Sequence, residues 1–149
     1  MRYASLVVFL LLTAAAAVTG SQFLPGEWYA ALAKPAWTPP GWLFAPVWTV
    51  LYVMIAVAGW LAWQRSGFGQ PITLWVAQLV LNAGWTWIMF GRYQIGAALV
   101  DIIALWVTIL AFITATWRVS RSAALLFVPY WLWVSFATAL NAAIWHLNP

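Results

Sequence analysis

The sequence contains no cysteine and only one histidine. Without a thiol the chain cannot form disulfides, zinc–thiolate sites, iron–sulfur clusters or a cysteine nucleophile. Its two carboxylate side chains, Glu27 and Asp101, and the lone His146 are too few for a metal site built from several protein ligands. We therefore predict no protein-held metal, and any metal would have to arrive inside a cofactor.

Charge is scarce as well. Charged residues make up 5% of the chain, against about 25% in an average soluble domain. Hydrophobic residues make up 66%, and the mean hydropathy is +0.93. Most of the surface must therefore face hydrocarbon. The net charge of +4 comes from basic residues scattered one or two per connection, which predicts no nucleic-acid partner and marks them as topology signals.

Five apolar runs approach the length of about 20 residues that crosses a bilayer. These runs are approximately residues 6–24, 43–63, 72–90, 95–117 and 123–145. We predict an all-α integral membrane protein, a single five-helix domain over residues 1–149 with a long Pro/Trp-rich loop between the first two helices. The first run could instead be a cleaved signal peptide, but it exceeds the usual apolar core of about 7–15 residues.

The basic residues predict the orientation of the bundle in the membrane. With the N-terminus inside, the inner face collects Arg2, Arg65, Arg118 and Arg121, and the outer face holds Lys34 and Arg92. The positive-inside rule then places the N-terminus inside and the first loop and the C-terminus outside. Because no Arg/Ser-rich transit leader precedes the first run, we expect a bacterial envelope membrane.

Tryptophan is the most unusual component, with 14 residues in the chain. Eight lie near the ends of predicted spans, where an indole sits well at the headgroup boundary: Trp28, Trp37, Trp42, Trp60, Trp63, Trp75, Trp117 and Trp145. Six lie deeper, where lipid offers no acceptor for the indole N–H: Trp48, Trp85, Trp87, Trp106, Trp131 and Trp133. Some of the deeper six are therefore expected to face inward.

Helical spacing gathers aromatic, polar and small residues into stripes on three of the spans. The stripes are Trp48, Tyr52, Ile55 and Gly59; Gln78, Asn82, Trp85 and Met89; and Tyr130, Trp133, Ala137 and Asn141. If they converge, they form an aromatic box with a few amide groups, suited to a planar heterocycle. The alternative is that amides such as Gln78 and Asn82 only bridge neighbouring helices, as is common in membranes.

Other features point to packing more than to catalysis. Asp101 lies inside an apolar span and needs a partner; we favour a structural contact from an indole or backbone N–H over a functional role. Thr13, Ala17 and Gly20 give the first predicted helix a face of small side chains, which lets another helix approach closely. We favour a neighbouring helix of the same chain, with a homodimer as the alternative. No nucleophile elbow, phosphate loop or zincin helix is present.

One long motif carries a resemblance to a known family. Residues 28–42 read WYAALAKPAWTPPGW and residues 46–52 read PVWTVLY. This pattern resembles the TspO/MBR family, the tryptophan-rich sensory proteins related to the mitochondrial translocator protein, or peripheral benzodiazepine receptor. The resemblance extends over nearly the whole chain, through Asn82, Asp101, the pair at 129–130 and residues 136–141.

The resemblance implies a five-helix bundle, usually a homodimer, with a pocket beneath the first loop. Such a pocket binds porphyrins, haem-like tetrapyrroles and benzodiazepine-type ligands, with no covalently bound cofactor. By position, Trp48, Asn82, Trp133 and Ala137 match pocket residues, and Tyr29 and Pro39 match the loop above it. Together with the stripes, this predicts the ligand-binding set Tyr29, Pro39, Trp48, Tyr52, Gln78, Asn82, Trp85, Trp133 and Ala137.

The expected function is thus a membrane receptor that binds porphyrins in their sequestration, transport or regulation. The alternative is light- and oxygen-dependent porphyrin degradation, in which Trp48 and Trp133 would be the reactive indoles. Sterol or lipid transport ranks last, because residues 142–146, AAIWH, lack the Tyr and Arg of the sterol motif attributed to vertebrate relatives.

Overall fold

The computed structural model describes residues 2–149, and within that range it is helical with no strand. Five helices are long and apolar enough to cross a membrane, which confirms the predicted fold class. The α-helices are α1 (Arg2–Ser21), α2 (Gly26–Ala31), α3 (Phe44–Ser66), α4 (Gln70–Thr86), α5 (Ile95–Thr116) and α6 (Arg121–Leu147). A 3-10 turn, η1 (Gly41–Leu43), leads into α3, and a π-helical turn, η2 (Trp87–Gly91), extends α4.

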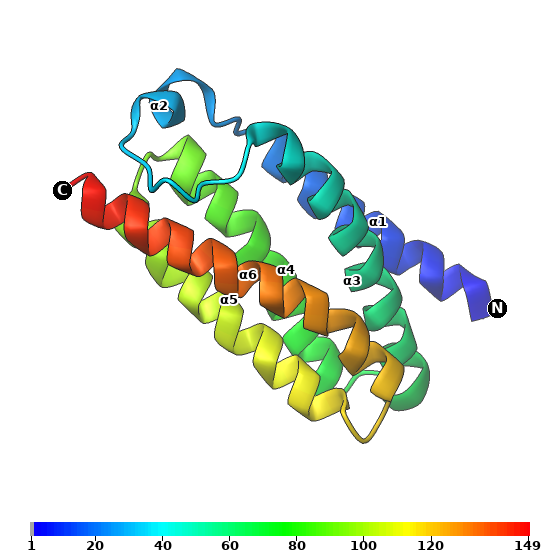
Figure 1. Cartoon of the computed structure of the whole chain (residues 1–149). Coiled ribbons are helices and arrows are strands. Elements are labelled where there is room, and N and C mark those ends of the chain that lie inside the picture. Colours follow the sequence, from blue (N-terminus) through cyan, green and yellow to red (C-terminus); the bar gives the residue numbers. More distant parts are fainter. Residues whose placement is uncertain (1) are drawn as a thin grey trace.

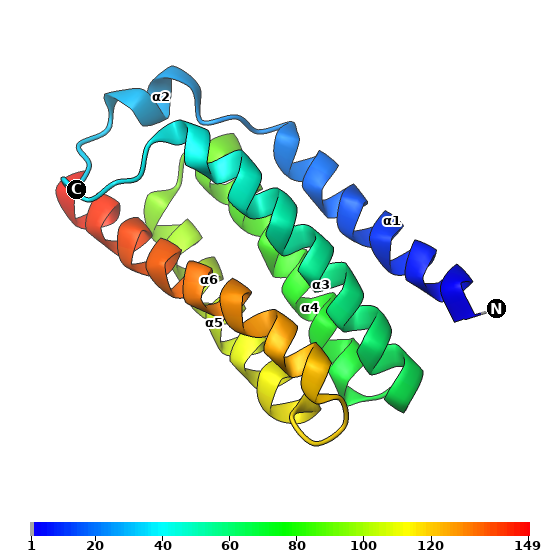
Figure 2. The same ribbon diagram turned by 45° about the vertical axis from the view of Figure 1, so that its right-hand side comes forward.

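The five long helices form a closed bundle (Figures 1 and 2). Around it, α1 packs against α3, α3 against α6, α6 against α5, α5 against α4, and α4 against α1. Helices α3 and α4 also touch each other across the bundle. The N-terminus and the α3–α4 and α5–α6 connections lie at one end, whereas α2 and the C-terminus lie at the other (Figure 1).

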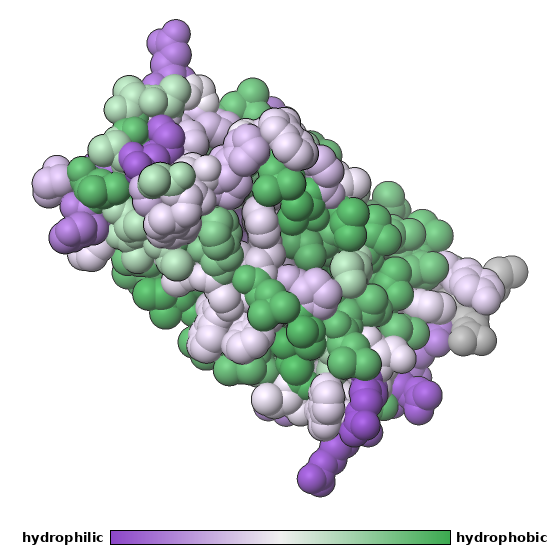
Figure 3. Space-filling view, viewed as in Figure 1, coloured by the Kyte–Doolittle hydropathy of each residue, from purple (hydrophilic) through white to green (hydrophobic). Residues whose placement is uncertain are grey.

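The outer surface matches a hydrocarbon environment. Figure 3 shows hydrophobic residues along the middle of the bundle and hydrophilic residues gathered at its two ends. Large aliphatic side chains on every long helix face outward, among them Leu11, Val50, Val80, Val107 and Leu132. Because lipid tails are as apolar as these side chains, the helices lose little by exposing them.

Close packing between α1, α3 and α4 depends on one glycine. A Cβ placed on Gly59 would lie 2.5 Å from Nε1 of Trp75 and 2.8 Å from Cδ1 of Phe9. The indole of Trp75 fills this space and donates a hydrogen bond to the carbonyl of Ile55 at 2.9 Å. The sequence had placed Trp75 at the headgroup boundary, and that interpretation was wrong: the side chain is 1% exposed. Trp60 is likewise buried, at 8%, and donates to Ser5 on α1.

The small face of α1 is used inside the chain. Thr13 and Ala16 are buried, and a Cβ on Gly20 would lie 3.6 Å from Oγ1 of Thr86 on α4. This confirms the prediction of packing within the chain. A homodimer stays a prediction.

The loop from residue 22 to residue 43 holds α2 in its first part and the prolines around η1 in its second. Lys34 organises the turn after α2, because its Nζ donates to the carbonyl oxygens of Tyr29 at 2.7 Å, Leu32 at 3.1 Å and Ala30 at 3.3 Å. The ammonium group also lies 4.7 Å from the centroid of the Tyr29 ring. One lysine thus donates to three carbonyl groups at the end of the short helix, of which that of Tyr29 also accepts the backbone N–H of Leu32.

Candidate ligand-binding site

Four polar residues of the three stripes, Tyr52, Gln78, Asn82 and Tyr130, meet in one hydrogen-bonded chain. The Tyr52 hydroxyl on α3 donates to Oδ1 of Asn82 on α4 at 3.2 Å. Nδ2 of Asn82 donates to the Tyr130 hydroxyl on α6 at 2.8 Å, and that hydroxyl donates to Oε1 of Gln78 at 2.9 Å. Gln78 and Tyr130 are fully buried. Side chains from α3, α4 and α6 therefore converge.

Aromatic rings gather beside this polar chain. The ring centroids of Trp48 and Trp133 are 6.4 Å apart, with the planes at 88°. Trp48 also contacts Tyr52 at 5.5 Å and Tyr130 at 6.4 Å. These edge-to-face and tilted contacts are the arrangements that aromatic quadrupoles prefer. Trp48 and Trp133 are only half-buried, so each keeps part of its surface for another partner.

Two hydrogen-bond donors at the site have no acceptor. Among residues 2–149, neither Nε2 of Gln78 nor Nε1 of Trp133 has a hydrogen-bond partner, although both atoms are buried. A buried donor without a partner costs about 1–3 kcal/mol. An oxygen or nitrogen acceptor placed against either donor would supply the missing partner.

Trp85 belongs to a second cluster, nearer the loop. Its Nε1 donates to Oδ1 of Asn141 at 2.9 Å, and Nδ2 of Asn141 donates to the carbonyl of Ile95 at 3.1 Å. Its ring also contacts Phe90 at 5.5 Å. These bonds tie α4, α5 and α6 together, which is the helix-bridging role that the sequence left open for membrane amides.

The long loop covers the end of the bundle above the site through aromatic contacts. Trp37 meets Phe136 of α6 with centroids 5.6 Å apart, and Tyr29 meets Phe90 at 5.7 Å. Where the loop ends, Phe44, the first residue of α3, meets Trp133 at 5.8 Å. Burial raises the pKa of the Tyr29 phenol above its ordinary value, so the hydroxyl stays protonated at neutral pH.

Asp101 differs from its sequence-based interpretation. Its Oδ2 is buried and accepts no hydrogen bond from residues 2–149. A Cβ on Gly84 would lie 3.4 Å from its Oδ1, so the carboxylate faces the bare backbone of α4. Within residues 2–149 the expected bond from an indole N–H to this Oδ2 is absent.

The predicted site residues fall into three groups. Trp48, Tyr52, Gln78, Asn82 and Trp133 lie together at the junction of α3, α4 and α6. Ala137 is half-buried one turn beyond Trp133 and packs against the bundle core. Trp85 lies in the second cluster, and Tyr29 and the half-buried Pro39 lie in the loop.

The predicted set omitted three aromatic residues that the structure brings to the site. Tyr130 bridges Asn82 and Gln78, while Phe44 and Phe136 pack on Trp133 at 5.8 Å and 5.7 Å. Tyr130 belongs to the stripe of the last span, and Phe136 lies three residues after Trp133, on the same helix face. The sequence pattern could therefore have placed both at the site. No sequence pattern indicates Phe44, because its position depends on where the loop enters α3.

Comparison with known proteins agrees with this architecture. The model of the TspO/MBR family matches residues 4–146. The tryptophan-rich protein TspO of Chlorobaculum tepidum is 45% identical over 139 residues, covering 87% of each chain. Protein CrtK of Rhodobacter capsulatus is 36% identical, covering 95% of this chain and 91% of its own. The translocator protein of Homo sapiens is 41% identical, covering 87% of this chain and 81% of its own.

These matches extend over nearly the whole length of both this chain and its relatives, so the resemblance in the loop and the second helix is confirmed. The chain belongs to the TspO/MBR family of membrane proteins.

Proposed function

We propose that this protein is a membrane receptor for planar tetrapyrroles of the protoporphyrin or haem type, and for benzodiazepine-type ligands. It would act in tetrapyrrole sequestration, transport or regulation. The observation that carries the proposal is the meeting of Trp48 from α3, Asn82 from α4 and Trp133 from α6 at one place beneath the loop.

The chemistry of these groups suits such a ligand. A tetrapyrrole presents a wide flat π-system, and the half-buried faces of Trp48 and Trp133 supply stacking surfaces for it. Its carboxylates and a benzodiazepine carbonyl are acceptors, which the unpaired donors of Gln78 and Trp133 require. Stacking supplies affinity, and the donors orient the ligand.

Binding requires the loop to move. Trp37 of the loop packs on Phe136 of α6, and Phe136 in turn packs on Trp133. A ligand that enters between the loop and the three helices must replace some of these aromatic contacts with its own. The loop therefore functions as a lid, and the rate of its opening limits association.

The proposal is tested by replacing each indole separately. Trp48→Phe and Trp133→Phe should each weaken protoporphyrin binding by about 3- to 10-fold, the equivalent of one aromatic contact or one hydrogen bond. Affinity is measured by titrating the quenching of protein fluorescence in detergent or nanodiscs. Trp42→Phe is the matched control, because Trp42 is 73% exposed in the loop and should bind as the parent does. Unchanged affinity in both site variants would refute the site.

The contact between the two indoles also favours a second candidate, in which dioxygen oxidises the bound porphyrin under light. A ligand stacked on one indole would lie close to the other. Illuminated protein with protoporphyrin should then lose the porphyrin absorption band faster than free porphyrin does, and faster than the Trp48→Phe and Trp133→Phe variants do. If the absorption band of the bound porphyrin is lost no faster than that of free porphyrin, degradation is excluded and the receptor function remains.

A further inference from the structure

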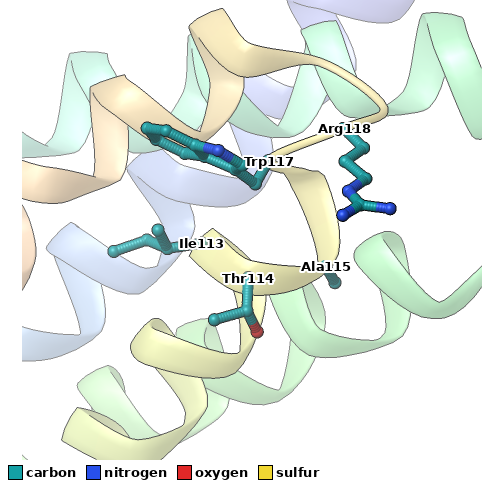
Figure 4. Close-up of a pocket in the computed structure, with 5 residues that line it drawn as sticks. All are labelled: Ile113, Thr114, Ala115, Trp117 and Arg118. Atoms are coloured by element: carbon teal, nitrogen blue, oxygen red, sulfur yellow. The ribbon is translucent and has the colours of Figure 1, made fainter.

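Two adjoining hollows lie at the end of the bundle remote from the proposed receptor site. One, of about 600 Å³, is bounded by Arg65 at the end of α3 and by residues 117–122 of the α5–α6 connection. The other, of about 400 Å³, lies over the last turn of α5 and is lined by Ile113, Thr114, Ala115, Trp117 and Arg118 (Figure 4). Trp117 and Arg118 line both hollows.

The larger hollow is strongly basic. Arg65, Arg118 and Arg121 line it, which is half of the six Lys and Arg residues of the chain. The two carboxylate side chains of the chain, Glu27 in α2 and Asp101 near the start of α5, belong to the opposite end of the bundle. No acidic side chain thus neutralises the three guanidinium groups. Such groups bind phosphate oxygens through paired hydrogen bonds.

The smaller hollow is lined mainly by aliphatic and aromatic side chains, and it lies at the end of an apolar span. Figure 4 shows Ile113, Thr114 and Ala115 on the last turn of α5, with Trp117 and Arg118 at its end. The indole of Trp117 is 42% exposed, and the guanidinium of Arg121 lies 4.6 Å from its ring. A tryptophan at a span end marks the level of the lipid headgroups.

We propose that this end of the bundle is a binding site for an anionic phospholipid. The headgroup phosphate lies among Arg65, Arg118 and Arg121, and one acyl chain runs along Ile113 and Thr114. The two adjoining hollows match the two parts of such a lipid: a basic hollow at headgroup level and an apolar one on the membrane side. A free phosphate would use only the first, so the apolar hollow and the exposed Trp117 favour the lipid.

The site lies at the end of the bundle that the distribution of Lys and Arg places inside. The cytoplasmic leaflet is the one that carries most anionic lipid in many membranes. The lipid site is separate from the receptor site beneath the loop, and its occupancy does not depend on whether tetrapyrroles bind there.

Native mass spectrometry tests the site directly. The delipidated full-length protein is incubated with an equimolar mixture of phosphatidylglycerol and phosphatidylcholine that share the same acyl chains, and the retained lipid is counted. The parent should retain phosphatidylglycerol in preference to phosphatidylcholine. Arg118→Gln and the triple variant Arg65→Gln/Arg118→Gln/Arg121→Gln should bring that ratio towards about one.

Arg92→Gln is the matched control, since it removes the same charge at the other end, where the Arg92 guanidinium lies 5.6 Å from the Trp87 ring. It should keep the preference of the parent. An equal loss in Arg92→Gln would mean that net charge alone attracts the lipid, and this would overturn the site. If the triple variant fails to fold, the single variant Arg118→Gln and the parent still test the proposal. A parent that retains the two lipids equally would contradict it.

Inorganic phosphate forms the second arm of the experiment. At millimolar concentration it should neither displace phosphatidylglycerol nor raise the melting temperature as the lipid does. If inorganic phosphate raises the melting temperature as much as the lipid does, the three arginines bind a free anion, and the proposal of a lipid site is wrong.

Discussion

Asn148 and Ala33 exchange two hydrogen bonds across 115 positions of sequence. The backbone N–H of Ala33 donates to Oδ1 of Asn148 at 3.0 Å, and Nδ2 of Asn148 donates to the carbonyl of Ala33 at 2.8 Å. The same Nδ2 also donates to the carbonyl of Ile144 at 2.7 Å, in the last turn of α6. We call this arrangement the Asn148 latch. It ties the loop above the proposed receptor site to the end of α6.

Removing the Asn148 latch should make the loop above the proposed site open and close faster. Asn148→Ala deletes both bonds to the loop, each of which contributes about 0.5–1.5 kcal/mol. We expect the association and dissociation rates of protoporphyrin to rise by up to about tenfold. The equilibrium affinity should change less than either rate.

Stopped-flow fluorescence quenching measures these rates. Gln22→Ala is the control, because Gln22 lies at the start of the same loop and its side chain, among residues 2–149, bonds only to Val18 and Ser21 nearby. Rates in Asn148→Ala that match those of the control would show that the latch does not govern access.

The polar chain through Asn82 should support both stability and binding. Asn82→Leu leaves the Tyr52 hydroxyl without its acceptor and the Tyr130 hydroxyl without its donor, inside the bundle. The free energy of unfolding should fall by about 1–3 kcal/mol, and ligand affinity should fall with it. Denaturation in detergent micelles measures the first and fluorescence titration the second.

Thr49→Ala is the control for Asn82→Leu. Thr49 is exposed on α3, and within the part of the chain that the structure describes its hydroxyl bonds only to the carbonyl of Ala45, one turn before it. Its loss should leave stability within about 0.5 kcal/mol of the parent. If Asn82→Leu is as stable as Thr49→Ala, the hydrogen-bonded chain does not hold the three helices together.

Gly59 should not tolerate a methyl group. Gly59→Ala places a Cβ 2.5 Å from Nε1 of Trp75 and 2.8 Å from Phe9, so α1, α3 and α4 must shift apart. Overpacking of this kind costs about 1–3 kcal/mol, which should appear as a lower melting temperature. Gly20→Ala meets Thr86 at an ordinary 3.6 Å and should be nearly neutral. Equal melting temperatures for the two variants would contradict the packing described between these helices.

Much of this arrangement was readable in the sequence, because a membrane imposes simple constraints. Five apolar runs predicted five spans, since only helices satisfy their backbone groups in lipid. The stripe containing Gln78 and Asn82 predicted an inward face, since an amide exposed to hydrocarbon is costly. Trp48 and Trp133 followed from the same spacing, and the structure brings them to 6.4 Å.

What the sequence did not contain were contacts set by the mutual placement of distant segments. Asn148 gave no signal, because its bond to Ala33 depends on where the loop returns over α6. Trp75 looked like a headgroup residue, yet α1 and the bare backbone at Gly59 enclose it. Asp101 is expected to find a donor, but it faces the bare backbone at Gly84, and its Oδ2 has no hydrogen-bond partner among residues 2–149. Each outcome depends on competition between neighbours, which spacing along one helix does not encode.

The central claim is that Trp48, Asn82 and Trp133 contact one ligand beneath the loop. Its most direct test is an experimental structure of the protein with bound protoporphyrin. We expect the macrocycle against the two indoles, with acceptor atoms near the amide of Gln78 or the indole N–H of Trp133. A macrocycle bound on the lipid-facing surface, with the contact between Trp48 and Trp133 unchanged, would contradict it.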